Sequence, residues 1–296
     1  MGKYVLITGT SSGIGKAVAL RLLDKGFDVF GCDRQPASIE HPHFYGITMD
    51  VTSEEAVQAA FISVSRVTDR LAAVVNVCGI MFMGSLIEEP AGRLEQIMSV
   101  NLLGMERVNR IFFPMIEKGH GRILNFSSEF GTYAVIPFNA YYTISKHAVE
   151  SYSDGLRREL QYLKIPVVTI RPGAFRTDME KSIGPIYQKI VDSSTHYRSV
   201  LEKMEPMLSL GTLLLREPDV MAKVVVKALT ARKPRNVYSC NHNPAIKLMS
   251  MLPGKWIDVI FYYLFREQGE MSNPAAINHR GCFCGSSQSE LLFRGR

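Results

Sequence analysis

The stretch VLITGTSSGIGKAVAL, residues 5–20, joins a short apolar run to an amphipathic helical pattern through a glycine-containing loop. A strand that stops, turns tightly and starts a helix needs glycine where the backbone passes close to itself or to a ligand. The free N–H groups and the positive dipole end of such a helix bind phosphate. The stretch therefore predicts a site for the pyrophosphate of a dinucleotide. Five loop residues are expected to line that cofactor: Gly9, Ser12, Gly13, Ile14 and Gly15.

Asp33 ends a second apolar run, 18 residues after Gly15, and this spacing strengthens the dinucleotide prediction. A carboxylate at this place accepts hydrogen bonds from the adenosine ribose hydroxyls and repels a 2′-phosphate, so it favours NAD over NADP. The neighbouring Arg34 could attract that phosphate if Asp33 turned away. NAD is therefore the expected cofactor, with NADP as the alternative.

Asp50 ends a third apolar run, and Val51 follows it. We expect both residues beside the adenine, because ligands of such sheets lie beyond the carboxyl ends of the strands. The alternative for Asp50 is that it caps a helix that starts near Ser53.

Apolar runs and longer amphipathic segments alternate through the first two-thirds of the chain. The runs predict buried strands at 4–9, 28–33, 44–50, 71–79, 121–128 and 166–173, with another at 236–240. The amphipathic patterns predict helices at 14–25, 53–68, 91–117, 142–163 and 218–230. This alternation predicts an α/β fold, a single Rossmann-type doubly wound parallel sheet with helices on both faces.

Three regions follow from these patterns. We expect a catalytic domain over 1–244, in which the Met- and Ile-rich stretch at about 179–215 forms either a helical lid over the substrate or a helical pair that buries ordinary core. The apolar segment 245–267 is too short to span a bilayer. It packs on the protein's own core or a partner subunit, or it anchors the protein at a membrane surface. The polar, aperiodic residues 268–296 are expected to be a disordered tail.

Composition narrows the function classes. The net charge of +6 is mild, and no Lys/Arg cluster with interleaved aromatic residues predicts nucleic-acid binding. The five cysteines form no CxxC pair and the seven histidines lack ligand spacing, so no metal site is expected. The N-terminus shows no secretory pattern, and an odd number of scattered cysteines fits reduced thiols. We therefore expect a cytoplasmic protein, with segment 245–267 as its candidate membrane contact.

Six motifs occur together in order: TGTSSGIG, NVCG, SVN, NFSS, YTISK and RPGAFRT. In order and spacing they resemble the motifs of the short-chain dehydrogenase/reductase family, over roughly residues 3–240. The run PFNAYY before TISK looks like the hydroxysteroid and retinol dehydrogenase branch of that family. The resemblance implies an oxidoreductase that acts on CH–OH groups with NAD or NADP.

The resemblance also implies a catalytic set made of Asn101, Ser128, Tyr142 and Lys146. Ser128 lies one residue further from Tyr142 than the family's commonest spacing, but it keeps the usual offset to the following glycine. Ser127 is the alternative serine.

Two cofactor contacts carry over in the same way. Thr177 in RPGAFRT matches the threonine that contacts the nicotinamide carboxamide, and Asn76 keeps the first position of the motif NVCG. Val77 and Cys78 depart from the family's usual Asn-Ala at the next two positions, which puts the local packing beside the cofactor in doubt.

The chemistry that this set implies is proton transfer beside a nicotinamide. A free tyrosine has a pKa near 10, so Tyr142 needs the charge of Lys146 to lower its pKa before it can act as a general acid/base. Residues four apart share a helix face, whereas Tyr141 is five residues from Lys146 and is turned away. Lys146 would also hold the nicotinamide ribose, as would Tyr142. Ser128 would bind the substrate oxygen and Asn101 would support a proton relay.

The expected substrate is a lipophilic secondary alcohol or ketone, such as a steroid, a retinoid or a long-chain alcohol. The family usually forms dimers or tetramers through the helices that match 91–117 and 142–163, so a homo-oligomer is expected. A non-catalytic NAD(P)-binding sensor on the same fold is the alternative function, although such a sensor has no need of all four catalytic residues.

Overall fold

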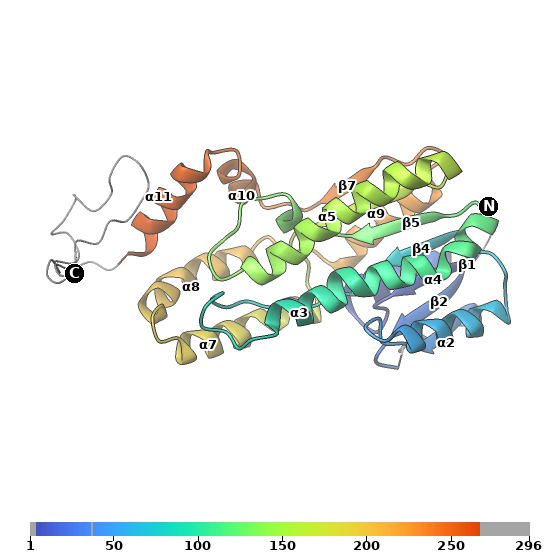
Figure 1. Ribbon diagram of the computed structural model, residues 1–296, viewed down its shortest axis with the longest axis horizontal. Helices are drawn as coiled ribbons and strands as arrows, with labels where there is room; N and C mark the ends of the chain where they lie inside the picture. The colour runs from blue at the N-terminus through green and yellow to red at the C-terminus, as the bar shows by residue number, and fades with distance from the viewer. Residues whose placement is uncertain (1–3, 37, 267–296) are drawn as a thin grey trace, which may run out of the picture.

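The computed structural model of the protein describes residues 4–36 and 38–266 (Figure 1). The expected tail at 268–296 lies outside these residues. The sheet of the protein consists of parallel strands in the order β3-β2-β1-β4-β5-β6-β7. The strands are β1 (Tyr4–Thr8), β2 (Asp28–Asp33), β3 (Phe44–Thr48), β4 (Ala73–Asn76), β5 (Arg122–Phe126), β6 (Val167–Pro172) and β7 (Val237–Cys240).

Helices cover both faces of this sheet, so the predicted doubly wound α/β fold is confirmed. The α-helices are α1 (Gly13–Asp24), α2 (Glu54–Ser65), α3 (Arg93–Met98), α4 (Met105–Lys118), α5 (Ala140–Leu160), α6 (Asp178–Lys181), α7 (Ile183–Ser193), α8 (Arg198–Thr212), α9 (Pro218–Thr230), α10 (Pro244–Met249) and α11 (Gly254–Phe265). Shorter helical turns are η1 (Ser99–Gly104), η2 (Glu129–Gly131) and η3 (Gln161–Leu163).

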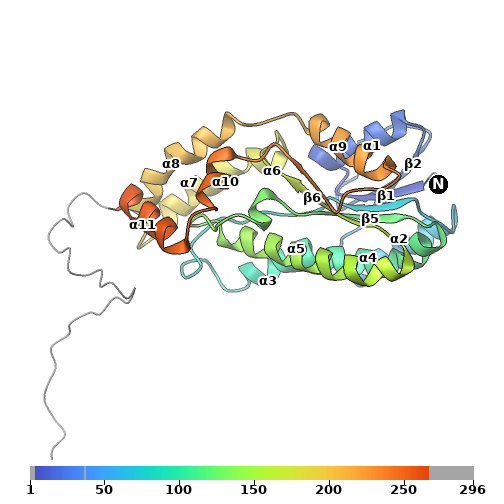
Figure 2. The ribbon, with the colours of Figure 1, turned by 90° about the horizontal axis from the view of Figure 1, so that it is seen from above.

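The two faces of the sheet have separate apolar cores because alternate strand residues point in opposite directions. In β1, Val5 and Ile7 pack with α1 and α9, whereas Leu6 packs with α2 and α4. All three side chains are fully buried. Figure 2 shows α1 and α9 on one side of the sheet and α2, α4 and α5 on the other. Strand β1 therefore lies in the interior, and the loop that follows it opens at the carboxyl edge of the sheet.

The predicted helix over 91–117 is interrupted. Helices α3 and α4 are joined by η1, a π-helical turn, rather than forming one regular helix. Gly104 ends this turn against Val51, where a Cβ on the glycine would lie 2.7 Å from the valine side chain. π-Turns inside helices often occur at functional sites. This one carries Asn101.

The region expected to form the lid contains α6, α7 and α8. Side chains of α7 and α8 pack with the loop before α5 and with the last helix, and we call the buried members the lid cluster: Ile136, Tyr187, Ile190, Val191, Leu201, Met204 and Phe265. Figure 1 shows α7 and α8 beyond one end of the sheet, at the same end as α10 and α11. One face of α11 therefore packs on the protein's own core, as the first interpretation of segment 245–267 predicts.

Candidate active site

The loop between β1 and α1 depends on glycine at three places. Gly9 and Gly13 have positive φ angles of 79° and 54°, a region that side chains with a Cβ rarely adopt. A Cβ on Gly9 would lie 3.0 Å from the backbone of Cys78, and one on Gly15 would lie 1.8 Å from the carbonyl oxygen of Gly9. Because these residues lack side chains, α1 begins directly against the end of β1. The backbone forms a narrow cradle that fits a pyrophosphate at a helix N-terminus.

The start of α6 closes one side of this cradle. Thr177 caps α6 by accepting a hydrogen bond from the backbone N–H of Glu180, at 3.2 Å. A Cβ on Gly13 would lie 3.1 Å from the methyl group of Thr177. The pKa of Asp178 is lowered first by its hydrogen bond from Lys181 and then by its hydrogen bond from the hydroxyl of Ser12. The structure thus brings the predicted residues Thr177 and Ser12 together.

Asp33 ends β2 beside the same loop. Its Oδ2 accepts hydrogen bonds from the backbone N–H of Ser11 at 3.0 Å and from the Ser11 hydroxyl at 2.8 Å. Its Oδ1 accepts one from the backbone N–H of Gln35, at 3.1 Å. Asp33 therefore stabilises the glycine loop in addition to lying where a ribose contact is expected.

Asp50 does not cap α2, so that alternative is wrong. Ser53 is the cap, because its hydroxyl accepts a hydrogen bond from the backbone N–H of Ala56 at 3.0 Å. Asp50 instead binds the backbone N–H and the hydroxyl of Thr52, at 2.8 and 2.7 Å. The adjacent Val51 is buried, and its carbonyl accepts a hydrogen bond from Arg107.

Asn76 has a role that the motif did not predict. Its side chain is buried, and its amide donates to the side-chain oxygens of Asn109 at 2.7 Å and Asn125 at 3.0 Å. Asn109 and Asn125 in turn reach Tyr152 and Ser153 on α5. This buried polar network ties β4, β5, α4 and α5 together.

Sequence reasoning missed the partners of Asn76. The available signal was an asparagine inside the apolar run RILNF and another on the apolar face of α4. Asparagine at such positions is buried only where it has partners.

Ser128 and Tyr142 meet at the carboxyl end of β5. Their side chains are 5% and 9% exposed, and the hydroxyl of Ser128 interacts with the phenol of Tyr142. The hydroxyl of Ser127 points elsewhere and donates to the carbonyl of Lys146. The geometry therefore favours Ser128 over Ser127 as the serine beside the tyrosine.

Lys146 lies one helical turn after Tyr142 on α5. Its ammonium nitrogen is 5.6 Å from the centre of the Tyr142 ring and donates to the carbonyl of Phe126 at 3.0 Å. Tyr141 packs with Ile97 in a buried cluster that also contains Tyr142. We call this the Tyr142 cluster: Ile97, Tyr141 and Tyr142, with Ile80, Met81, Phe82, Met98 and Phe130 packed against it.

Asn101 reaches the same place from η1. Its amide oxygen accepts a hydrogen bond from the backbone N–H of Ile80 at 2.8 Å, and its amide nitrogen donates to the carbonyl of Ile80 and to the hydroxyl of Ser145. A Cβ on Gly79 would lie 3.2 Å from the Asn101 oxygen and 3.6 Å from the Lys146 ammonium. Asn101 and Lys146 thus flank Gly79.

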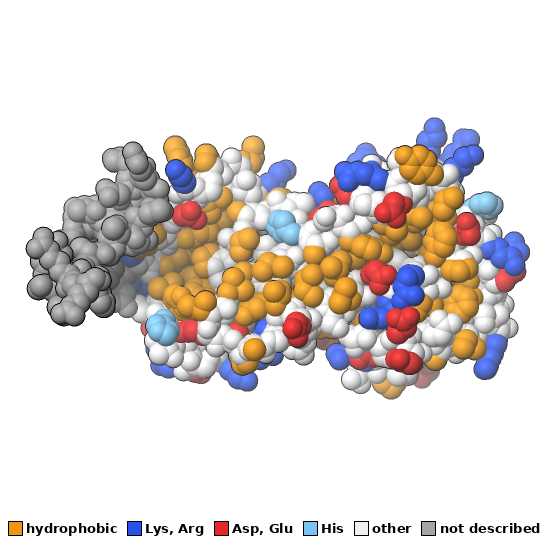
Figure 3. Space-filling view, viewed as in Figure 1, with side chains coloured by type: hydrophobic (Ala, Val, Ile, Leu, Met, Phe, Trp, Pro, Cys, Tyr) orange, Lys and Arg blue, Asp and Glu red, His pale blue; other side chains and the backbone are white. Residues whose placement is uncertain are grey.

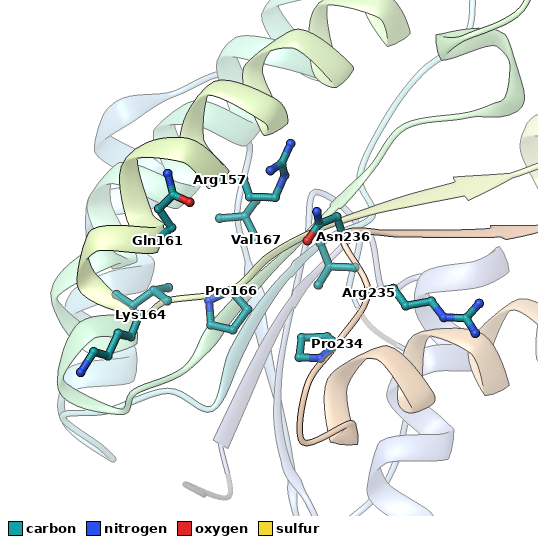
Figure 4. Close-up of a pocket in the computed structure, with 10 residues that line it drawn as sticks. Arg157, Gln161, Lys164, Pro166, Val167, Pro234, Arg235 and Asn236 are labelled. Carbon is teal, nitrogen blue, oxygen red and sulfur yellow. The ribbon is translucent and has the colours of Figure 1, made fainter.

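A pocket at the other end of the sheet lies away from these residues (Figure 4). It is lined by Arg157 and Lys164 near the end of α5, by Val167 at the start of β6, and by Arg235 and Asn236 just before β7. Ligands of doubly wound sheets bind at the opposite, carboxyl edge. This open, basic hollow is therefore no part of the candidate site.

Comparison with known proteins shows the family of the chain. The family model described as short chain dehydrogenase matches residues 3–187. The chain belongs to the short-chain dehydrogenase family. Members are oxidoreductases that use a nicotinamide cofactor, so the chain is such an enzyme. The glycine cradle described above fits that cofactor.

Individual relatives agree with the family. The chain is 32% identical to the uncharacterized oxidoreductase YbbO of Escherichia coli, over 88% of this chain and 94% of that protein. It is 31% identical to human retinol dehydrogenase 16, over 88% of each. The structure resembles 3-ketoacyl-(acyl-carrier-protein) reductase from Brucella melitensis complexed with NADH, with a TM-score of 0.66, 23% identity, and 80% and 95% of the two chains covered. That likeness shows the fold alone.

Burial dominates the electrostatics of this short-chain dehydrogenase site. Burial raises the pKa of Tyr142 to about 12, although the hydrogen bond with the Ser128 hydroxyl acts in the opposite direction and lowers it. Burial also lowers the pKa of Lys146 to about 8. In the protein alone, burial keeps the pKa of Tyr142 above its ordinary value and that of Lys146 below its own, because desolvation penalises both charged forms. At neutral pH the pair is therefore a neutral phenol and an ammonium.

Lys146→Met tests the cost of that buried ammonium. The pKa of Lys146 in the folded protein, about 8, lies below its ordinary value of 10.5. Between these values the unfolded chain keeps a proton that the folded protein has released, so folding gains stability as pH rises. The stability of the wild type relative to the variant should therefore increase from pH 8 to 10.5, by up to about 3 kcal/mol. Urea unfolding of both proteins across this range measures it, and a constant difference would contradict the charged, buried lysine.

Proposed function

We propose that this enzyme interconverts a lipophilic secondary alcohol and its ketone, with NAD as the preferred cofactor. The observation that carries the proposal is the meeting of Ser128, Tyr142 and Lys146 at the carboxyl end of β5, within an apolar surround. The glycine cradle lies on the same edge of the sheet. The bound nicotinamide would accept or supply the hydride and, when oxidised, add a positive charge.

Each polar residue has a role that follows from its contacts. In reduction, the neutral phenol of Tyr142 donates a proton to the carbonyl oxygen, and in alcohol oxidation the phenolate accepts one. Ser128 donates a hydrogen bond to the same oxygen as charge develops on it. Lys146, charged at neutral pH, stabilises the phenolate and holds the cofactor ribose. Asn101, held by Ile80 and Ser145, orients a proton relay beside Lys146.

The walls around Tyr142 support a lipophilic substrate. Phe130 packs against the lid cluster as well as against Tyr142, and its ring meets that of Tyr142 edge-on, with the ring centres 6.3 Å apart. The ring of Tyr142 is thereby bordered by methionine and aromatic side chains. Pockets lined in this way bind apolar molecules and use a few polar groups for orientation. Two relatives at about 30% identity are named retinol dehydrogenase 7 and retinol dehydrogenase 16, which supports the same substrate class.

Asp33 supports NAD over NADP. Its carboxylate lies at the end of β2, within hydrogen-bond distance of the loop that would hold the pyrophosphate. A negative charge there accepts ribose hydroxyls and repels a 2′-phosphate. One relative is named an NADPH-dependent 3-dehydrocapnine reductase, so NADP is kept as the alternative cofactor.

We also propose that α10 and α11 rest on an anionic membrane surface. No helix in the described part of the chain has the length and apolar character to cross a bilayer. Several exposed apolar or aromatic side chains nevertheless lie on or between these helices and would form the membrane-facing edge, among them Leu248, Met251, Trp256 and Tyr263. Lys247, Lys255 and Arg266 lie on the same helices or directly after them. Figure 3 shows hydrophobic side chains at this end of the molecule, with basic and acidic side chains beside them. Aromatic rings with basic neighbours favour anionic lipid surfaces.

The exposed face of α4, α5 and η1 supports a homo-oligomer. Leu103 and Ile144 are 48% and 38% exposed there, and Figure 3 shows hydrophobic side chains along this face. Apolar groups gathered on one face favour a symmetric contact between two copies. A monomer in analytical ultracentrifugation would contradict this proposal.

Tyr142→Phe should reduce turnover by about a thousandfold or more, because the general acid/base is lost. Binding of NADH, measured by fluorescence, should stay within about threefold of the wild type, since the cradle is unchanged. Tyr141→Phe is the matched control, and its turnover should remain within about threefold. The assay is steady-state kinetics on a panel of lipophilic alcohols and ketones. Comparable activity of both variants would refute the assignment of Tyr142.

Asp33→Ala should shift cofactor preference toward NADP. Loss of the carboxylate removes the repulsion of a 2′-phosphate, so the ratio of kcat/KM for NAD to that for NADP should fall by about tenfold or more. Asp24→Ala, on the exposed end of α1, is the control. An unchanged ratio in Asp33→Ala would discredit the ribose contact.

Membrane contact is tested by flotation with vesicles of anionic and neutral phospholipid. The wild type should float with anionic vesicles, and Trp256→Ser combined with Tyr263→Ser should reduce the bound fraction at least about threefold because aromatic anchors are lost. Tyr162→Ser, which changes an 82% exposed tyrosine beyond the end of α5, should bind like the wild type. If the wild type binds neither the anionic nor the neutral vesicles, the proposal is wrong.

A further inference from the structure

Glu129 is a buried acid that the proposed chemistry does not use. It begins the turn η2 directly after Ser128, and it is 4% exposed. Its Oε2 accepts a hydrogen bond from the backbone N–H of Asn243, at 2.6 Å. Burial raises the pKa of Glu129 to about 7, and this N–H opposes the rise. A carboxyl group that is removed from water and held by one backbone donor needs that donor.

We call residues 243–266 the C-terminal extension, and Asn243 is its first residue. It is the N-cap of α10, and its side-chain oxygen accepts from the backbone N–H groups of Ala245 and Ile246. Its own N–H lies outside the helix and is given to Glu129. One hydrogen bond therefore joins the turn after β5 to an element 114 residues later in the chain.

Further contacts hold the same two segments together. The Tyr133 hydroxyl lies 2.7 Å from Nδ1 of His242, and the backbone N–H of Ala134 donates to the hydroxyl of Ser250 at 2.9 Å. Ile246 packs against the lid cluster. Figures 1 and 2 both place α10 beside the loop that leads into α5. The chain from 129 to 136 thus lies against residues 242–250.

This contact reaches the candidate catalytic groups through one turn of backbone. The hydroxyl of Ser128 accepts a hydrogen bond from the N–H of Phe130, so the geometry of η2 orients that hydroxyl. Three groups of contacts set the pKa of Tyr142. Burial raises it most, the hydroxyl of Ser128 lowers it, and the negative charge of Glu129 raises it further by disfavouring the phenolate. The other titratable groups around the turn come from its own loop and from α5, β6 and the α10 segment: Tyr133, Glu150, Arg171, His242 and Lys247.

We propose that Glu129 is a positioning residue, which couples the docking of the C-terminal extension to the placement of Ser128 and Tyr142. The proposal rests on the proposed roles of those two residues. It implies that the extension, which also carries the proposed membrane-facing edge, sets the activity of the site through Glu129 and not only through substrate contact.

Two variants separate the hydrogen bond from the charge. Glu129→Ala removes the acceptor of the Asn243 N–H, so kcat for ketone reduction should fall about tenfold to a hundredfold, with KM for NADH within about threefold of the wild type. Glu129→Gln keeps an acceptor oxygen, so its kcat should stay within about threefold. Glu159→Ala, an exposed acid near the end of α5, is the matched control. Thermal unfolding and NADH binding show that each variant is folded.

The pH profile provides a readout that a merely structural role would not move. Glu129→Gln removes a negative charge beside Tyr142 and makes the phenolate easier to form. The alkaline rise of alcohol oxidation should therefore move to lower pH by about half a unit. If both Glu129 variants keep the kcat and the pH profile of the wild type, the proposal is overturned.

Hydrogen exchange of residues 242–250 distinguishes failure of this proposal from failure of the proposed function. Faster exchange in Glu129→Ala than in Glu129→Gln is expected, because only the alanine variant releases the extension. Equal exchange would overturn the coupling, even where activity falls. A wild type that turns over no substrate on the panel would refute the proposed function, and the exchange experiment would still decide whether Glu129 holds the extension.

Discussion

The close approach of Gly15 to the carbonyl of Gly9 is the contact on which the site depends. A side chain on Gly15 would occupy the space of that carbonyl, at 1.8 Å, so only glycine allows α1 to start at the very end of β1. Since β1 lies inside the sheet, this turn places a helix N-terminus at its carboxyl edge. The ends of β2, β4 and β5 share that edge. Asp33, Gly79 and Ser128 thereby lie along one edge of the sheet, where we propose that the cofactor binds.

The second constraint is the cost of burying polar groups beside that edge. Tyr142, Lys146 and Glu129 are all nearly removed from water. Burial raises the pKa of Tyr142 and Glu129 and lowers that of Lys146, so it favours the neutral form of each. Hydrogen bonds to backbone groups offset part of that cost. Lys146 donates to the carbonyl of Phe126, and Glu129 accepts from the backbone N–H of Asn243. A tyrosine that is neutral in the protein alone is suited to proton donation, and a nearby positive charge is needed before it can serve as a base.

Apolar side chains pack around Tyr142 and the turn that carries Ser128. The lid cluster and the Tyr142 cluster meet at Phe130, next to the turn that carries Ser128. Helix α11 contributes Phe265 to the lid cluster and exposes Trp256 on its other face. The same short extension therefore packs against the lid, borders the site through α10 and presents an aromatic edge to the surroundings.

Much of the fold was predictable because its signals are local. Alternating apolar runs and helical periods predicted the strands, and the glycine loop with Asp33 predicted the cofactor edge. The four-residue step from Tyr142 to Lys146 correctly predicted a shared helix face. Local patterns did not predict the π-helical turn at Asn101, the capping of α2 by Ser53 or the use of Asn76 inside a buried network. Those depend on neighbours from distant segments.

The sequence by itself determined the order of the elements and the glycine turn, because these follow from backbone sterics and periodicity. The residue types of the candidate catalytic set came from the motifs that resemble the short-chain dehydrogenase/reductase family. The tertiary structure alone decided which serine meets Tyr142, the direction in which burial moves the pKa of Tyr142, and the joining of Glu129 to Asn243. The physical reason is that burial and hydrogen-bond partners arise only when separate segments pack against each other, and the segments that carry Glu129 and Asn243 are 114 residues apart in the chain.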